Sequence, residues 1–340
     1  MQPTTTKRQC HRLLHRLGLN EQQPTLAANS LTPIRPAYAT ERFRLLLVFP
    51  PETSIDRRAE NTDSDVQHVP LIGGLVSRSF FGVRHRTLER RRLHSVSVPF
   101  DFDEVFDADY LFFYEPLFAD VTEADVDAIW RLLKLEPDMA VLDLACGHGR
   151  IANRLAERGA RVTGLDANAL FLDHARRDAA SRGIQVDYVE GDMRLLPWTN
   201  ERFDRVLSWF TSFGYFDDQD NRRVLQEAHR VLRPDGRLLI ENNNLVEQLP
   251  RWQPAFVTER DGNFAIDRSC FDPTTGRATT ERVIIRNART RRFMFSVRMF
   301  VAAELRDWLL DAGFTSVHLL DPNGDPLTQG SRRMISIAYR

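Results

Sequence analysis

The stretch Val141-Leu-Asp-Leu-Ala-Cys-Gly-His-Gly-Arg150 decides the fold of this chain. An apolar strand runs into a turn of small residues, and the turn leads into a segment with helical spacing. Gly147 and Gly149 allow the backbone to approach a ligand closely, and the N-terminus of the following helix favours an anionic group. The run from Gly147 to Ala152 also satisfies the dinucleotide fingerprint G-x-G-x-x-G/A, so this turn alone leaves the class of ligand open.

The chain around this turn alternates strands and helices. We expect strands at 139–144, 161–165, 185–189, 203–209 and 237–240, and helices at 151–158, 170–182 and 221–232. This βαβ order predicts a parallel sheet with helices on both faces. Residues 255–300 differ, because alternating stretches and a turn signal at 272–276 predict three antiparallel strands there. A helix at 304–312 and strands at 315–320 and 334–339 close the pattern.

The segment before the sheet has an unusual composition. Residues 101–127 carry ten acids and no base, together with many aromatic residues. Phe106, Tyr110 and Tyr114 recur at helical spacing, which predicts an amphipathic helix. A second helix follows at 122–135, and Thr122-x-x-Asp125 matches a capping box at its start.

Three features distinguish the site from a dinucleotide site. Asp143 lies four residues before Gly147, where a dinucleotide site usually has an apolar residue. Gly191-Asp-Met193 follows the third strand and offers a carboxylate and a backbone N–H to an adenine edge. The third feature is the turn Pro234-Asp-Gly236 followed by an antiparallel ending. Asp166, at the end of the second strand, could bind ribose hydroxyls of either cofactor.

Together these motifs resemble class I S-adenosylmethionine-dependent methyltransferases of a bacterial small-molecule branch, over about residues 101–340. The resemblance implies an α/β fold: a Rossmann-like, doubly wound seven-stranded sheet whose last strand is antiparallel. Residues 255–300 would form an antiparallel insertion over the substrate. Two departures from the family pattern are Ala145, in place of the first motif glycine, and Asp235, in place of a common glycine.

The resemblance also assigns the cofactor, S-adenosyl-L-methionine, and its product, S-adenosyl-L-homocysteine. The methionine part would be lined by Asp143, Ala145, Gly147 and Gly149. The ribose and the adenine would be bound by Asp166, Ala167, Asp192 and Met193. Further cofactor contacts are expected from the aromatic helix, the motif turn and the fourth strand end, at Tyr110, Tyr114, Arg150, Ser208 and Trp209.

The acceptor side carries weaker signals. Tyr215 and Glu241 follow the fourth and fifth strands, and either could serve as a base if the acceptor keeps its proton. Phe213, Asn243 and Arg298 are expected to contact the substrate. A guanidinium on a semi-buried strand needs an anion, so Arg298 binds either a substrate anion or an acid such as Glu241.

Composition excludes several classes of function. Forty-six basic and 47 acidic residues leave a net charge of −1, which argues against a nucleic-acid partner. Lys7 and Lys134 are the only lysines, which argues against P-loop, Schiff-base and Tyr-x-x-x-Lys chemistry. The three cysteines lie far apart, so no metal site is expected. No apolar run is long enough for a transmembrane helix, and a cytoplasmic location without membrane contact is expected.

Residues 1–100 match no pattern that assigns a function. Their Pro, Thr, Gln, Asn and Asp clusters predict an extension that is partly disordered or caps the domain, and that could form a homodimer contact. The sequence thus predicts methyl transfer to an N, O or C atom of a small-molecule acceptor, in the biosynthesis of a metabolite. The alternatives are an NAD(P)-dependent oxidoreductase and a repurposed S-adenosylmethionine-binding protein, such as a cyclase or a non-catalytic partner.

Overall fold

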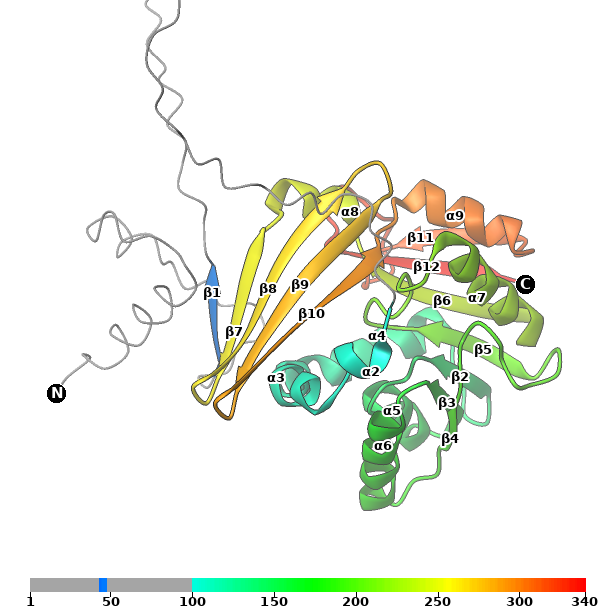
Figure 1. Ribbon diagram of the computed structural model, residues 1–340. Helices are drawn as coiled ribbons and strands as arrows, with labels where there is room; N and C mark the ends of the chain where they lie inside the picture. Colours follow the sequence, from blue (N-terminus) through cyan, green and yellow to red (C-terminus); the bar gives the residue numbers. More distant parts are fainter. Residues whose placement is uncertain (1–42, 48–99) are drawn as a thin grey trace, which may run out of the picture.

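Two β-sheets form the framework of the computed structural model, which describes residues 43–47 and 100–340 (Figure 1). Predictions for the remainder of the first hundred residues lie outside the described residues. Within the described ranges, no helix has the length and apolar character needed to cross a membrane.

The larger sheet has seven strands. They are β2 (Ala140–Leu144), β3 (Arg161–Asp166), β4 (Asp187–Glu190), β5 (Phe203–Ser208), β6 (Leu232–Asn243), β11 (Ser316–Leu320) and β12 (Arg333–Tyr339). The spatial order is β11-β12-β6-β5-β2-β3-β4. Neighbours from β6 to β4 are parallel, whereas β12 is antiparallel to both β6 and β11. The predicted sheet, with its antiparallel last strand, is confirmed.

Helices cover both faces of this sheet. One face carries α4 (Thr122–Leu132), α5 (Arg150–Glu157) and α6 (Ala169–Arg182), and the other carries α7 (Asp218–Val231) and α9 (Ala302–Asp311). Successive side chains of a strand point to opposite faces of the sheet. In β2, Val141 therefore packs on the face that carries α4, α5 and α6, and Leu142 packs on the face that carries α7 and α9. This arrangement confirms the doubly wound prediction.

The second sheet is antiparallel throughout and stands beside the carboxyl ends of the parallel strands (Figure 1). It contains β1 (Phe43–Leu47), β7 (Ala255–Arg260), β8 (Asn263–Asp272), β9 (Arg277–Arg286) and β10 (Arg289–Arg298), in that order. In the chain β7 to β10 follow α8 (Leu245–Gln248) and η2 (Leu249–Arg251), whereas β1 comes before them.

The prediction of three strands in 255–300 was wrong, because two tight hairpins, together with the turn at 272–276, produce four. Asp261 and Gly262 join β7 to β8 with φ of 48° and 73°, and Asn287 and Ala288 join β9 to β10 with φ of 50° and 61°. Positive φ at both central residues is the hairpin geometry that matches strand twist, and Asp-Gly is its usual sequence signal. The sequence therefore carries the usual signal for one of these turns, at Asp261-Gly262.

The aromatic segment forms α2 (Phe102–Val105), α3 (Ala108–Phe118) and η1 (Ala119–Val121). Asp101 and Asp107 cap the two helices through their carboxylates. Val105 and Phe113 are buried against the second sheet, where they meet Ile284 and Phe295. These helices thus tie the second sheet to the domain.

The predicted capping box at Thr122 was wrong. The Thr122 hydroxyl donates to the carbonyl of Phe118, and α4 has no side-chain cap. The carboxylate of Asp125 bonds instead to Arg150 and Arg333, at 2.9 and 2.8 Å. A buried carboxylate is stabilised more by two guanidinium groups than by one backbone N–H, so long-range charge pairing outweighed the local motif.

Gly149 provides a test of the turn geometry. It starts α5 with a φ of 78°, and a Cβ atom there would lie 2.3 Å from Tyr188 Oη and 2.7 Å from Ala175 Cβ. We expect Gly149→Ala to lower the free energy of unfolding by about 3 kcal/mol or more, from backbone strain and overpacking together. Chemical denaturation measures this change.

Gly183 is the matched control. It has a φ of 68° after α6, and a Cβ atom there would have nothing within 4 Å. Gly183→Ala should therefore show the strain alone, about 1 kcal/mol. Equal losses for the two variants would contradict the packing argument.

Candidate active site

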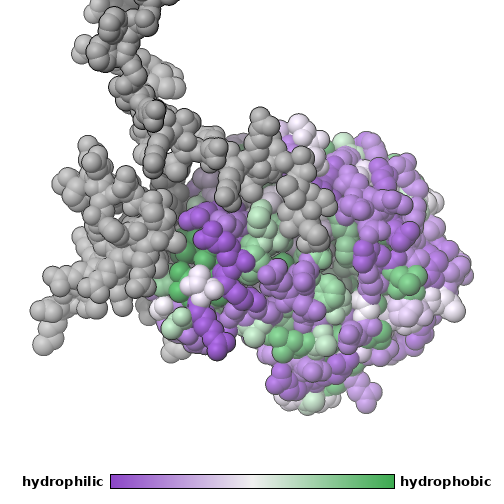
Figure 2. Space-filling view, in the orientation of Figure 1, coloured by the Kyte–Doolittle hydropathy of each residue, from purple (hydrophilic) through white to green (hydrophobic). Residues whose placement is uncertain are grey.

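A large cavity lies between the carboxyl ends of the parallel strands and the inner face of the second sheet. Its volume is about 1590 Å³, above the roughly 300–1,000 Å³ of an ordinary small-molecule pocket. Figure 2 shows hydrophobic side chains gathered in the middle of the view, between mainly hydrophilic flanks. The cavity is large enough for two ligands side by side.

The glycine-rich turn forms one wall of this cavity. Ala145 and Gly147 line it and have φ of 54° and 57°. The N–H of Gly147 donates to Asp166 at 2.8 Å, and the N–H of Asn168 donates to the other carboxylate oxygen at 2.9 Å. Asp166 is thereby aimed across the ends of β2 and β3, and each oxygen retains acceptor capacity for a hydroxyl pair.

Asp143 lies deeper in the same wall and is 3% exposed. Burial and the nearby Asp166 raise its pKa to about 8, although the charge of Arg150 opposes the shift. Burial also raises the pKa of Asp166, against the effect of its backbone hydrogen bonds. At neutral pH Asp143 therefore holds a proton that an arriving cation would displace.

The third strand end supplies Asp192 and Met193, which also line the cavity with Ala167. Asp192 accepts hydrogen bonds from Arg194 at 2.9 and 2.6 Å, and Arg194 also pairs with Asp220. Burial raises the pKa of Asp192, but these bonds outweigh burial and hold the pKa below its usual value. Sequence analysis missed Arg194, because nothing in the local pattern distinguishes a pairing arginine from a solvated one.

An aromatic cluster closes the cavity from the side of α2 and α3. Tyr110 stacks on Tyr114 with ring centroids 4.9 Å apart, and Tyr215 lies 4.7 Å from Phe100. Phe106 joins the two pairs, at 5.1 Å from Tyr110 and 5.5 Å from Tyr215. Burial raises the pKa of all three tyrosines, so their hydroxyls stay neutral donors.

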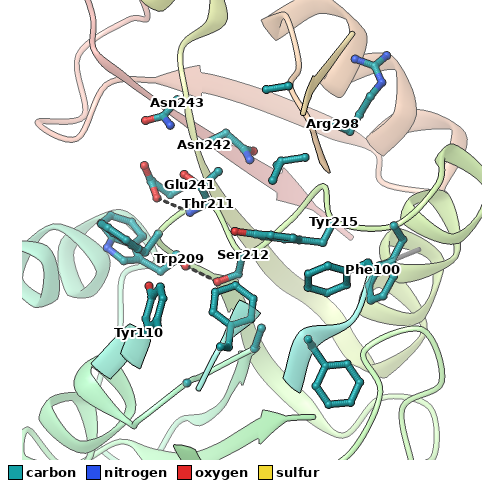
Figure 3. Close-up of a pocket in the computed structure, with 18 of the residues that line it drawn as sticks. Phe100, Tyr110, Trp209, Thr211, Ser212, Tyr215, Glu241, Asn242, Asn243 and Arg298 are labelled. Carbon is teal, nitrogen blue, oxygen red and sulfur yellow. Dashed lines mark hydrogen bonds between the residues drawn. The ribbon is translucent and has the colours of Figure 1, made fainter. Parts of the chain in front are cut away.

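Glu241 lines the cavity, and each of its two oxygens accepts a hydrogen bond. Its carboxylate accepts from Arg333 at 2.7 Å and from the N–H of Thr211 at 3.1 Å, and it is 2% exposed (Figure 3). Phe210 and Thr211 have φ of 62° and 56°, which is strained for such side chains. Glu241 therefore holds this turn, and its expected role as a base stays a prediction.

Two residues expected to contact the substrate have their side chains engaged within the protein. Phe213 is 1% exposed and stacks on Phe300 in the core of the sheet, so its expected contact with substrate was wrong. Arg298 pairs with Glu304 and Asp218, and Figure 3 shows its guanidinium directed away from Tyr215. Of the two alternatives for Arg298, the structure favours an acid of the protein, although the residue still borders the cavity.

The remaining predicted residues divide by position. The structure places Tyr110, Tyr114, Arg150, Trp209, Tyr215 and Asn243 on the cavity wall. Ser208 is buried within the sheet, and Gly149 packs behind the turn against α6 and Tyr188. Arg150 lines the wall while paired with Asp125 and placed over the rings of Phe118 and Phe210. In the described part of the chain, no group of side chains is arranged to hold a metal ion.

Comparison with known proteins agrees with this geometry. Residues 141–236 match a family model described as a methyltransferase domain. The chain is 41% identical over 102 residues to a demethylmenaquinone methyltransferase of Thermus thermophilus, covering 29% of this chain and 45% of that protein. It is 28% identical to a ubiquinone/menaquinone biosynthesis C-methyltransferase of Pectobacterium carotovorum, covering 61% and 81%.

Solved structures show the same fold. A S-adenosylmethionine-dependent methyltransferase from Clostridium acetobutylicum matches with a TM-score of 0.58 and 17% identity, over 70% of this chain and 99% of that one. The chain spans about half the length of the first curated relatives, so these comparisons define the domain and not the acceptor. Residues 141–236 thus match a methyltransferase domain, and the chain shares the fold of a solved S-adenosylmethionine-dependent methyltransferase.

Proposed function

We propose that this protein transfers a methyl group from S-adenosylmethionine to an N, O or C atom of a small-molecule acceptor. The observation that carries the proposal is the convergence of Asp143, Asp166 and Asp192 at the ends of three neighbouring strands, beneath a cavity with room for a second ligand. Ligands of open α/β sheets bind at these carboxyl ends.

The acids of the cavity wall would each bind a different part of the cofactor. Asp166 would accept hydrogen bonds from the ribose hydroxyls, and Asp192 with the N–H of Met193 would meet the adenine. Asp143, once ionised, would pair with the ammonium group of the methionine part. The cofactor supplies an activated methyl group, so the protein needs no strong electrophile of its own.

Catalysis would then rest on positioning. The strained Phe210–Thr211 turn, held by Glu241 and Arg333, lies where the two halves of the cavity meet. The aromatic helices and the second sheet cover the site and keep water out. Holding two reactants in line can lower a barrier by roughly 7–11 kcal/mol. Tyr215 is neutral and can donate a hydrogen bond to the acceptor, and an acceptor that is already deprotonated needs no base.

Direct tests separate this proposal from the alternatives. Titration calorimetry with S-adenosylhomocysteine should show binding, and labelled S-adenosylmethionine should transfer its methyl group to a compound in a small-molecule extract. Enhanced NADH fluorescence on mixing would instead favour an oxidoreductase. Tight cofactor binding without any labelled product would favour a repurposed protein.

Asp166→Ala tests the ribose contact. We expect the variant to bind S-adenosylhomocysteine about tenfold more weakly or worse, because a hydrogen bond to a charged group contributes ~1.5–3 kcal/mol. Calorimetry measures the change. Asp173→Ala is the control, since Asp173 pairs with Arg176 on the exposed side of α6 and should leave affinity unchanged. Equal affinities of all three proteins would refute the ribose contact.

The protonated Asp143 predicts a pH dependence. Its pKa is raised to about 8, so an ammonium ligand must displace a proton below that pH. Affinity for S-adenosylhomocysteine should rise with pH up to about 8, by at most about tenfold per pH unit. The stability of the ligand-free protein should fall over the same range, because the folded state binds the extra proton.

Asp143→Asn should flatten both dependences. Calorimetry in two buffers with different ionisation enthalpies measures the proton released on binding, and thermal melts against pH measure the stability. If the wild-type protein and Asp143→Asn have the same pH profiles, another group carries the dependence and the assignment fails.

A further inference from the structure

The inner face of the second sheet forms the half of the cavity that the cofactor residues do not line. Phe256 and Thr258 of β7, Ser269 of β8, Thr280 and Arg282 of β9 and Val297 of β10 line it. The strand register places these residues on one face, with Ser269 opposite Thr280 and Asp267 opposite Arg282. This face is where an acceptor would lie if the proposed function holds.

Arg282 is the buried charge on this face, with 7% of its surface exposed. Its Nε and Nη2 donate to the two oxygens of Asp267 at 2.7 and 2.8 Å. The guanidinium lies 5.0 Å from the ring centroids of both Tyr114 and Phe295. Among the described residues, Nη1 has no acceptor, so the pair is neutral overall and keeps donor capacity at a residue that lines the cavity.

The other arginines around the cavity are also neutralised. Carboxylates pair with Arg150, Arg194, Arg277, Arg298 and Arg333. Of the lining arginines in the described ranges, Arg332 alone has no ion pair, and it is exposed to solvent. Inside this cavity an anionic acceptor would lose its hydration without gaining a buried, unpaired arginine among the described residues, which is costly.

Rings and hydroxyls complete the wall. The hydroxyls of Ser269 and Thr280 bond to each other at 2.8 Å. Across the cavity, Figure 3 shows the ring of Tyr215 beside Phe100. Burial raises the pKa of Tyr215, so its hydroxyl stays a neutral donor. Aromatic and apolar surfaces next to hydroxyl donors favour a ring that carries oxygen.

We propose that the Arg282–Asp267 pair forms the centre of an acceptor subsite that takes an uncharged, ring-containing molecule with a hydroxyl or carbonyl oxygen. That oxygen accepts a hydrogen bond from Nη1 of Arg282, while Asp267 cancels the charge that would otherwise attract an anion. The pair therefore determines the charge selectivity of the proposed methyl transfer. This inference rests on the proposed function for the identity of the second ligand.

Three matched probes test the charge selectivity: catechol (neutral), protocatechuate (anion) and dopamine (cation). Dissociation constants are measured by saturation-transfer NMR titration against the full chain saturated with S-adenosylhomocysteine. We expect the wild-type protein to bind catechol at least about tenfold more tightly than either charged probe. Preferential binding of a charged probe by the wild-type protein, or no binding of any of the three, would overturn the proposal.

Single variants should shift the preference in opposite directions. Asp267→Asn leaves Arg282 without its counter-charge, and protocatechuate should gain about tenfold relative to catechol. Arg282→Met leaves Asp267 uncompensated, and dopamine should gain instead. Glu281→Gln is the control: it removes a carboxylate from the same sheet, paired with Arg268 and Arg292, but on the opposite face. An equal shift in Glu281→Gln would show a general charge effect and contradict the subsite.

Thermal melts and S-adenosylhomocysteine binding show whether each variant is folded. If either variant at the pair fails to fold, the wild-type order of the three probes still decides the proposal. Failure of the wild-type protein to bind S-adenosylhomocysteine would count against the proposed function. The probe titration can then be run without that ligand, so the two failures are distinguishable.

Discussion

The hydrogen bond from the N–H of Gly147 to the carboxylate of Asp166 joins the ends of β2 and β3 across the floor of the cavity. It requires a backbone that curls back at the end of β2, which is why Ala145, Gly147 and Gly149 all have positive φ. The bond fixes the position of Asp166 at the end of β3. Burial and the neighbouring Asp166 raise the pKa of Asp143 to about 8, so Asp143 holds a proton at neutral pH. The electrostatics of the proposed cofactor site therefore follow from one turn.

Arginine pairing organises the rest of the site. Asp125 joins Arg150 of α5 to Arg333 of β12, and Arg333 in turn holds Glu241 and the strained turn after β5. Removing one partner from such a buried network leaves an uncompensated charge, which typically costs about 3–5 kcal/mol. The planar guanidinium suits these multiple contacts better than an ammonium group. An arginine-rich chain can thereby line a cavity with cations and still leave its interior nearly neutral.

Local sequence patterns correctly predicted the fold of the larger sheet. Alternation of short apolar runs and helical segments predicted the parallel order, and the small residues after β2 predicted the binding turn. The predictions failed where a distant partner competed with a local one. Asp125 matched a capping box but pairs with two arginines, and Phe213 matched a cavity position but stacks on Phe300. Sequence spacing cannot show such competition, because the competing groups lie far apart in the chain.

The sequence alone determined the order of strands and helices in the larger sheet, the position of the glycine-rich turn and the three acids at strand ends, since these depend on residues close together in the chain. Only the tertiary structure decided how charges are shared. It assigned Glu241 to Arg333, Arg298 to Glu304, and Arg282 to Asp267. The physical reason is that a carboxylate or guanidinium pairs with a partner that is near in space, and strand register and packing bring together residues that are far apart in the chain.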